Sequence, residues 1–214
     1  MFIQLPDIIA EHLVVVFCGL NPGLSAATAG HHFAGRSNRF WRVVHLAGFT
    51  PEEIRPENDR VLLQYECGLT TVVERPTARA EQVSAQEFLA AAERFEQKIW
   101  RYAPRFIAFL GKAAYSALSG DTEIAWGSQQ TTLGGAAVWV LPNPSGRNRA
   151  FSLDQLTSAY RQLYRATELS RPSDVMMASA RAARLRKNVD ASTGIIPQSP
   201  NDSDCTLDGD SHTR

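Results

Sequence analysis

The sequence predicts an α/β protein: a three-layer α/β/α sandwich around a short, mainly parallel central sheet. Two short apolar runs, residues 13–18 and 136–141, are rich in valine and alanine and lack polar alternation, which is typical of strands buried on both faces. Segments with helical periodicity alternate with strand-like segments, and this order favours parallel strands between two helical layers. With 214 residues and 44% hydrophobic content, the chain can bury one substantial core.

The first apolar run ends abruptly at a loop that is rich in turn-forming residues. Pro22 fixes one φ angle and Gly23 allows a positive one, so this loop can present its backbone amides rigidly. Asn21 then lies at the carboxyl end of a central strand, where open α/β sheets bind their ligands. Asn-Pro-Gly alone is more often only a turn. However, a second Asn-Pro loop, residues 142–146, follows the other apolar run, and parallel strands would bring both loops to one edge.

Several shorter elements are expected in the amino-terminal half of the chain. They are one helical turn at residues 6–11, irregular structure at 26–36, a helix at 37–47, a helix at 57–65 and a strand at 68–73. Ser37 is a candidate cap for the helix at 37–47, and Gly48 can end it. The side chains available to pack this helix on the sheet are Phe40, Trp41, Val44 and Leu46.

The carboxyl-terminal half contains two capping-box patterns, Ser84 with Glu87 and Ser152 with Gln155, each at the start of a helical pattern. The first of these helices should end before Pro104. The elements between the two helices are a strand at 105–110, a helix at 112–118 and, after a loop through Trp126, the strand at 136–141. In the last helix, the inward face is marked by Leu153, Leu156, Tyr160 and Leu163.

Four strand ends of this predicted sheet point to one edge. They carry Asn21, Glu74, the pair Gly111-Lys112 and residues 143–146. A helix that begins at Lys112 also places free backbone amides where a phosphate could bind. This edge is therefore the predicted functional site.

Composition limits the classes of function. The formal net charge is zero, so any contact with nucleic acid has to come from a local basic patch. The cysteines Cys18, Cys67 and Cys205 lack the spacing of metal, iron–sulfur or disulfide frameworks, so we expect no cofactor, no metal and a reducing compartment. No apolar stretch is long enough to span a membrane, and residues 1–12 lack a secretory leader. We expect a cytoplasmic monomer.

The composition changes at about Arg171, where large apolar residues become rare. We therefore expect one domain at residues 1–170 and a disordered tail at 171–214, because such a segment cannot bury enough surface to offset its ordering entropy. The tail contains a basic stretch and an acidic end, made of Arg181, Arg184, Arg186 and Lys187 and of Asp202, Asp204, Asp208 and Asp210. A solvated tail explains these charges better than a DNA-tethering arm.

Four motifs together resemble a known family. They are Gly19-Leu20-Asn21-Pro22-Gly23-Leu24, Gly30-His31-His32-Phe33, Asn38-Arg39-Phe40-Trp41 and Asn143-Pro144-Ser145-Gly146. This set is similar to that of mismatch-specific uracil-DNA glycosylases, the Mug and thymine-DNA glycosylase branch, over residues 14–164. The resemblance implies a three-layer α/β/α enzyme that flips uracil opposite guanine out of duplex DNA. It would hydrolyse the N-glycosidic bond without a cofactor and leave an abasic site.

The resemblance implies roles for individual residues in the base pocket. Asn21 would hold the hydrolytic water through its side-chain carbonyl, and loop amides near Leu20 would donate to the departing base. Phe33 would stack on the flipped base, although an aromatic at this place could equally belong to the core. His32, with His31, would line the pocket or contact phosphate. Because Ala26 leaves more room than a hydroxyl residue, thymine or etheno-cytosine could also enter.

Other residues are candidates for DNA contacts. In the Mug pattern a leucine wedge follows Asn143-Pro144-Ser145-Gly146, whereas Arg147-Asn148-Arg149 follows here, so either Arg147 or Arg149 is the candidate wedge. Ser145 and Lys112 are candidate phosphate contacts, with Asn143 and Gly146 in the same loop. Glu74 is a candidate auxiliary base, but a salt bridge explains it better.

Two other functions fit the same loops. A nucleotide-binding α/β enzyme could use residues 19–25 as a phosphate cradle, but neither Gly-x-Gly-x-x-Gly nor Gly-Lys-Ser/Thr occurs there. A module that binds mismatched or damaged DNA without catalysis would share the DNA-contacting residues and lack base release.

Overall fold

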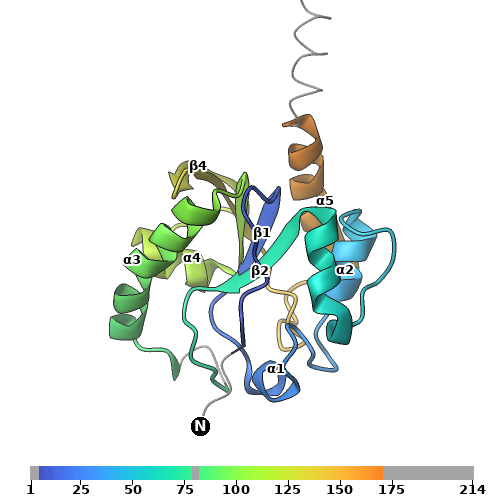
Figure 1. Ribbon diagram of the computed structural model, residues 1–214, viewed down its shortest axis with the longest axis horizontal. Helices are drawn as coiled ribbons and strands as arrows, with labels where there is room; N and C mark the ends of the chain where they lie inside the picture. The colour runs from blue at the N-terminus through green and yellow to red at the C-terminus, as the bar shows by residue number, and fades with distance from the viewer. Residues whose placement is uncertain (1–4, 79–81, 171–214) are drawn as a thin grey trace, which may run out of the picture. The chain divides into compact units, whose positions relative to one another are not determined.

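The computed structural model describes residues 5–78 and 82–170, which form a five-stranded sheet between two layers of helices (Figure 1). The strand order is β2-β1-β3-β5-β4. The strands are β1 (Val15–Gly19), β2 (Cys67–Thr71), β3 (Phe106–Leu110), β4 (Gly127–Leu133) and β5 (Ala136–Leu141). All pairs are parallel except β4 with β5, which is antiparallel. The predicted α/β fold with a mainly parallel sheet is confirmed.

The central strand β1 is buried on both faces, as its apolar run predicts. Val15 and Phe17 belong to one buried cluster, whereas Val16 and Cys18 belong to the other. This division follows from the alternation of side chains along a strand. A strand with a helical layer on each face therefore needs apolar residues at every position.

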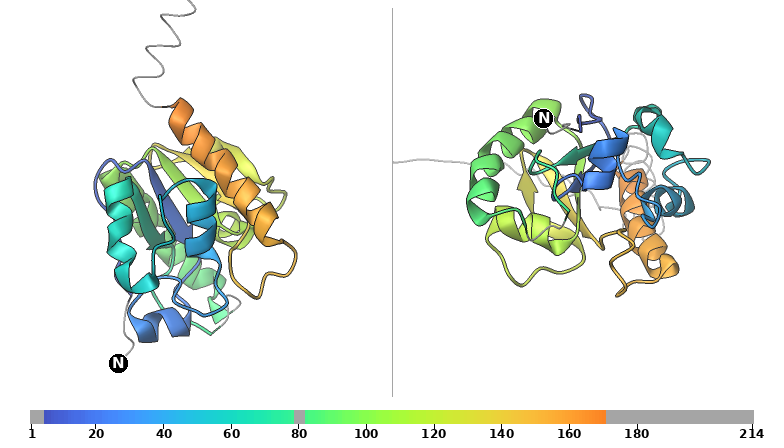
Figure 2. Two further views of the ribbon diagram at one scale, coloured as in Figure 1. Left: turned by 90° about the vertical axis from the view of Figure 1, so that its right-hand side faces the viewer. Right: turned by 90° about the horizontal axis from the view of Figure 1, so that it is seen from below.

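The helices lie on both faces of the sheet. One face carries α2 (Phe40–Ala47), the 3-10 helix η1 (Pro56–Tyr65) and α5 (Leu153–Leu169). The other face carries α3 (Ala85–Tyr102) and α4 (Lys112–Ser119), as the two further views show (Figure 2). Both capping boxes, at Ser84 and at Ser152, are confirmed. The end of α2 at Gly48, with a φ of 108°, is also as predicted.

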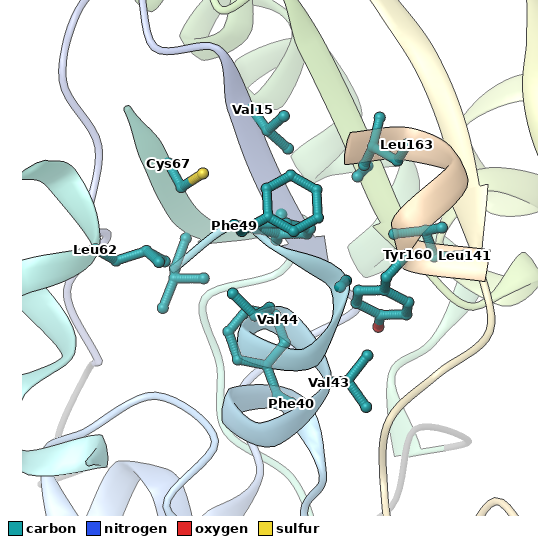
Figure 3. Close-up of a cluster of buried hydrophobic side chains, with 14 of the residues drawn as sticks. Val15, Phe40, Val43, Val44, Phe49, Leu62, Cys67, Leu141, Tyr160 and Leu163 are labelled. Atoms are coloured by element: carbon teal, nitrogen blue, oxygen red, sulfur yellow. The ribbon is translucent and has the colours of Figure 1, made fainter. Parts of the chain in front are cut away.

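The core between the sheet and α2 and α5 is dense in aromatic side chains. Phe17 lies edge-on to Phe40 at 5.4 Å and to Phe49 at 5.2 Å between ring centroids. Figure 3 shows Phe40 from α2 and Tyr160 from α5 converging beneath the strands. The hydroxyl of Tyr160 donates a hydrogen bond of 3.2 Å to the carbonyl of Pro142, at the start of the second Asn-Pro loop. Tyr160 thus connects the core to the predicted site.

Two predictions about local structure are wrong, and one strand was missed. Residues 6–11 are not helical, because Ile8 pairs with Leu69 as an antiparallel bridge with hydrogen bonds of 2.9 and 2.7 Å. The segment 26–36, expected to be irregular, begins inside a short helix, α1 (Leu24–Ala29). Strand β4 was not predicted, because it is an edge strand of mainly polar residues and therefore lacks an apolar run.

The start of α2 also differs from the prediction. The helix begins at Phe40, and the Asn38 side chain, not Ser37, accepts a hydrogen bond of 2.9 Å from the Phe40 amide. Phe40, Trp41 and Val44 are buried as expected, whereas Leu46 is 39% exposed. Leu46 therefore lies on the solvent side of the amphipathic helix.

The predicted tail, residues 171–214, with its basic and acidic clusters, lies outside the described residues. In the part of the chain that the structure describes, no helix has both the length and the apolar character needed to cross a membrane.

We predict that Tyr160→Phe lowers the free energy of unfolding by about 1 kcal/mol, since the buried carbonyl of Pro142 loses its donor. Urea unfolding of both proteins measures this difference. The matched control is Tyr164→Phe, a half-buried tyrosine on the same helix, which should change the value by less than about 0.5 kcal/mol. Equal effects of the two substitutions would contradict the assigned role of the hydrogen bond.

Candidate functional site

The carboxyl ends of the four parallel strands meet at one edge of the sheet, as predicted. Gly19 of β1 pairs with Thr71 of β2, and Leu110 of β3 pairs with Leu141 of β5. The loops that follow these strand ends therefore lie together, with α1 beside them at the lower end of Figure 1. The right-hand view of Figure 2 looks onto this end.

Backbone hydrogen bonds join the loop after β1, along its length, to the segment after β2. The carbonyl of Leu20 accepts a hydrogen bond from Val73 at 3.0 Å, and that of Pro22 accepts one from Thr77 at 3.1 Å. The amide of Leu24 in turn donates to the carbonyl of Thr77 at 3.2 Å. These bonds extend the pairing of β1 and β2 beyond the sheet and hold Asn21 between them.

The orientation of the Asn21 amide follows from its partners. Its Nδ2 donates to the carbonyl of Arg75 at 3.0 Å and to the hydroxyl oxygen of Thr77 at 2.7 Å. A backbone carbonyl only accepts hydrogen bonds, so the amino group of Asn21 has to face Arg75. The side-chain oxygen therefore points the other way. In this half-buried side chain it is an acceptor with a fixed direction.

Arg75 is itself anchored to the start of α3. Its guanidinium donates to both carboxylate oxygens of Glu87, at 2.6 and 2.9 Å, and to the carbonyl of Gln82 at 2.9 Å. The hydrogen bonds from Arg75, followed by that from the Ser84 amide, lower the pKa of Glu87 to about 2. A chain of contacts thus runs from the α3 capping box through Arg75 to Asn21.

Phe33 has an unusual backbone conformation, with a φ of 56°. Positive φ in an aromatic residue is strained, and such strain often marks functional sites. The ring is stacked on Phe40 with 4.0 Å between centroids, and Phe33 remains half-buried. The interpretation as a residue packed on the core therefore describes part of Phe33, and its stacking on a base stays a prediction.

His32 anchors the Phe33 segment. It is 4% exposed, and its Nε2 donates to the carbonyl of Pro6 at 2.9 Å. Its amide donates to Asp59 Oδ2 at 3.0 Å, and burial lowers the pKa of its ring. His31 Nδ1 lies 3.5 Å from the same Asp59 oxygen. These contacts give His32 a structural role, and its contact with a base stays a prediction.

The second Asn-Pro loop is held by its own side chains. Asn143 Oδ1 accepts from the amide of Ser145 at 2.9 Å, and Ser145 Oγ accepts from the amide of Arg147 at 3.3 Å. The Asn148 side chain donates to the carbonyl of Asn143 at 2.9 Å. The polar motif residues therefore shape the loop, and direct DNA contacts by Asn143 and Ser145 stay predictions.

Arg39, the residue just before α2, organises this loop, a role that the sequence did not indicate. Its guanidinium donates to four carbonyls of the loop at distances of 2.7 to 3.4 Å, namely those of Pro144, Ser145, Asn148 and Phe151. Its amide donates to Pro144 as well, at 3.0 Å. Gly146 packs against Ser37, since a Cβ at this position would lie 2.4 Å from the Ser37 Cβ. Gly146 is therefore needed for loop packing whether or not it contacts DNA.

Arg147 connects the two Asn-Pro loops. Its Nη1 donates to the carbonyl of Ala78 at 3.0 Å, and Ala78 follows Thr77, the partner of Asn21. The predicted meeting of the two loops at one edge is therefore observed through residues 75–78. Arg149 is exposed in the same loop. The identity of the wedge stays a prediction.

The remaining candidates lie at the same edge with different partners. Glu74 is 61% exposed, and its carboxylate lies 4.0 Å from Lys98 Nζ, which also pairs with Asp7 at 2.6 Å. This contact agrees with the salt-bridge interpretation of Glu74. Ala26 is buried in α1. Lys112 begins α4 and places its Nζ 4.8 Å from the ring centroid of Trp126.

Within residues 5–78 and 82–170, no group of three or more histidine, cysteine, aspartate or glutamate side chains has the arrangement of a metal site.

Comparisons with known proteins agree with this architecture. Residues 6–167 match the family model described as the uracil DNA glycosylase superfamily. The solution structure of a Methanosarcina acetivorans protein, provisionally described as a uracil DNA glycosylase, is similar to this chain with a TM-score of 0.53. The sequence identity is 22%, and the match covers 77% of this chain and 99% of the other. At this identity the structural match shows the shared fold.

We predict that Arg39→Lys loosens the 143–151 loop without unfolding the protein, because an ammonium group cannot reach four carbonyls in a planar fork. Loss of two hydrogen bonds corresponds to about 2 kcal/mol. Hydrogen exchange of the amides at Ser145 and Arg147 should accelerate accordingly. Arg42→Lys, at an exposed position of α2, is the control and should leave this exchange unchanged.

We also predict a contribution of the pair Arg75 and Glu87 to acid stability. The pKa of Glu87 falls from an ordinary value of 4.5 to about 2 in the folded protein, so its stabilisation is full above pH 4.5 and is lost as the pH falls towards 2. Glu87→Gln should flatten this part of the pH profile of unfolding, as measured with urea between pH 7 and 3. Glu93→Gln on the same helix should keep the wild-type profile.

Proposed function

Because the chain belongs to the uracil DNA glycosylase superfamily, we propose that it is a monofunctional DNA glycosylase of the mismatch-specific branch. Its substrate is uracil opposite guanine in duplex DNA, and its product is an abasic site. The observation that carries the proposal is the fixed orientation of Asn21, whose amino group is bound to Arg75 and Thr77. The side-chain oxygen is left to hold a water molecule at the carboxyl edge of the sheet.

The reaction breaks the bond between the base and C1′ of deoxyribose. The transition state has a cationic sugar and an anionic base, so catalysis depends on placing water and stabilising charge. Asn21 Oδ1 accepts a hydrogen bond from the water, whose oxygen attacks C1′. The bond electrons leave with the base, and the water proton passes to solvent because an amide is a poor base. Turnover should therefore be slower than in an enzyme whose site is built around a carboxylate.

The base pocket follows from the neighbouring residues. Phe33 offers the exposed part of its ring to the flipped base, and such stacking contributes about 1–3 kcal/mol per base. The loop amides near Leu20 donate to the carbonyl oxygens of the base. Ala26, without a hydroxyl, leaves room for thymine and etheno-cytosine. Opening a mismatched pair costs less than opening a matched one, which favours bases opposite guanine.

The loop of residues 143–149 fills the position that the flipped base leaves. Insertion of Arg147 into the duplex would break its hydrogen bond to the carbonyl of Ala78, which is worth about 1 kcal/mol. Arg149 is the other candidate and is exposed. Either guanidinium can donate to the unpaired guanine, and their alanine variants distinguish them.

The decisive experiment uses duplexes with uracil, thymine or etheno-cytosine opposite guanine, followed by alkaline cleavage of abasic sites. The wild type should release uracil, and Asn21→Ala should lower the single-turnover rate by about 100-fold or more while duplex affinity changes little. Asn58→Ala, an exposed asparagine in η1, is the control. Duplex binding by the wild type without release of any base would favour the non-catalytic damage-binding function.

Asn21→Asp should release uracil more slowly than the wild type, although a carboxylate is the better base. One of its oxygens would face the carbonyl of Arg75, where the amino group now donates at 3.0 Å. Two acceptors repel each other, so the side chain would lose its position. Activity of Asn21→Asp at or above the wild-type level would show that the orientation by Arg75 does not matter.

A further inference from the structure

Trp126 is an exposed aromatic residue at the same edge of the sheet as Asn21. It is 43% exposed and directly precedes β4, whose first residue, Gly127, pairs with Val140 near the carboxyl end of β5. The polar sequence of β4 does not predict a strand. The position of Trp126 at this edge therefore could not be predicted from the sequence. Its exposure requires an explanation, since apolar rings gain free energy from burial.

The backbone around Trp126 is held by Gln129. The side-chain Nε2 of Gln129 donates to the carbonyl of Ala125 at 3.0 Å and to that of Gly127 at 2.9 Å, one on each side of Trp126. Gly127 has a φ of 97°, a conformation that other residues rarely adopt. Trp126 is therefore an exposed side chain on a constrained backbone, which is the arrangement of a binding residue.

Two side chains from other elements flank the ring. Lys112 Nζ lies 4.8 Å from its centroid, and the ring of Phe151 meets it edge-on at 5.4 Å. The carbonyl of Phe151 is bound by Arg39 at 2.7 Å, so this aromatic pair is joined to the loop proposed to fill the DNA duplex. Lys112, Trp126 and Phe151 thus form one cluster, called here the Trp126 cluster, next to that loop.

We propose that the Trp126 cluster binds the sugar-phosphate backbone of one DNA strand a few nucleotides away from the flipped one. Lys112 neutralises a phosphate, and Trp126 packs against the adjoining deoxyribose. The cation over the ring supports this choice, because the contact with Trp126 holds the Lys112 ammonium in place before DNA binds. Arg149, two residues before Phe151, is a further exposed cation in the adjoining loop. The proposal rests on the proposed function of the edge.

Strand order gives the approximate position of this contact on the DNA. In the sheet, β4 is three neighbours away from β1, which carries Asn21 at its carboxyl end. Strands lie about 4.8 Å apart, so the two positions are separated by about 14 Å across the sheet. One DNA strand advances about 3.4 Å per nucleotide, so the contacted phosphate lies about four nucleotides from the flipped base.

The test measures the affinity for a duplex that contains a tetrahydrofuran abasic analogue opposite guanine. Trp126→Ala should weaken binding by about fivefold to tenfold, as expected for one aromatic contact with DNA. The matched control is Trp100→Ala, a tryptophan that is 74% exposed on α3 and belongs to no part of the edge. Lys112→Gln should lower the slope of log K against log salt by about 0.9, the effect of one phosphate contact.

A second measurement locates the contact. Neutral methylphosphonates placed singly along each strand should weaken wild-type binding most at about four nucleotides from the analogue. Lys112→Gln should be insensitive to the substitution at that position. Trp126→Phe, which keeps an aromatic ring, should retain most of the affinity, and thermal unfolding of each variant reports whether it is folded.

The outcomes separate this proposal from the glycosylase proposal. Because the analogue cannot be hydrolysed, binding is measured whether or not the wild type releases a base. Equal affinities of Trp126→Ala and Trp100→Ala would overturn the proposal. So would a reduced single-turnover rate at saturating Trp126→Ala with unchanged affinity, because the residue would then act on base release.

Discussion

The pairing between the loop after β1 and the segment after β2 is the constraint on which the site depends. Backbone bonds at Leu20, Pro22 and Leu24 continue the β1–β2 pairing past the end of the sheet. Only this continuation brings the carbonyl of Arg75 and the hydroxyl of Thr77 to the amino group of Asn21. The direction of the Asn21 side-chain oxygen thus follows from backbone geometry, because the amino group of Asn21 donates to the main-chain carbonyl of Arg75.

Most of the fold could be predicted from sequence because its parallel strands are buried on both faces. Such strands appear as continuous apolar runs, and those at residues 13–18 and 136–141 were recognised for this reason. Strand β4 was not predicted, because an exposed edge strand carries polar residues, which do not distinguish it from a loop. Residues 6–11 were misassigned because their partner is Leu69, distant in sequence, and tertiary pairing overrides local helical preference.

The site could be predicted only as far as strand topology determines it. Parallel strands place Asn21 and Asn143 at one edge, and that much follows from the order of elements. The role of Arg39 did not follow, although the residue stood within a recognised motif. Its partners are backbone carbonyls 105 to 112 residues away, and every residue carries such a carbonyl. Contacts between a side chain and distant backbone therefore leave no signature in the sequence of the acceptor.

Many polar side chains at this edge bind other groups of the protein, and this affects how a protein with zero net charge binds DNA. Asn143 and Ser145 shape their own loop, and Arg75 is paired with Glu87. These groups can contact DNA only in exchange for existing bonds, so their net contribution to affinity is small. Attraction to phosphate then depends on the cations at the rim. Two such cations are Lys112, whose ammonium lies over the Trp126 ring, and the exposed Arg149. A chain with zero net charge can therefore present a basic face where its strands end.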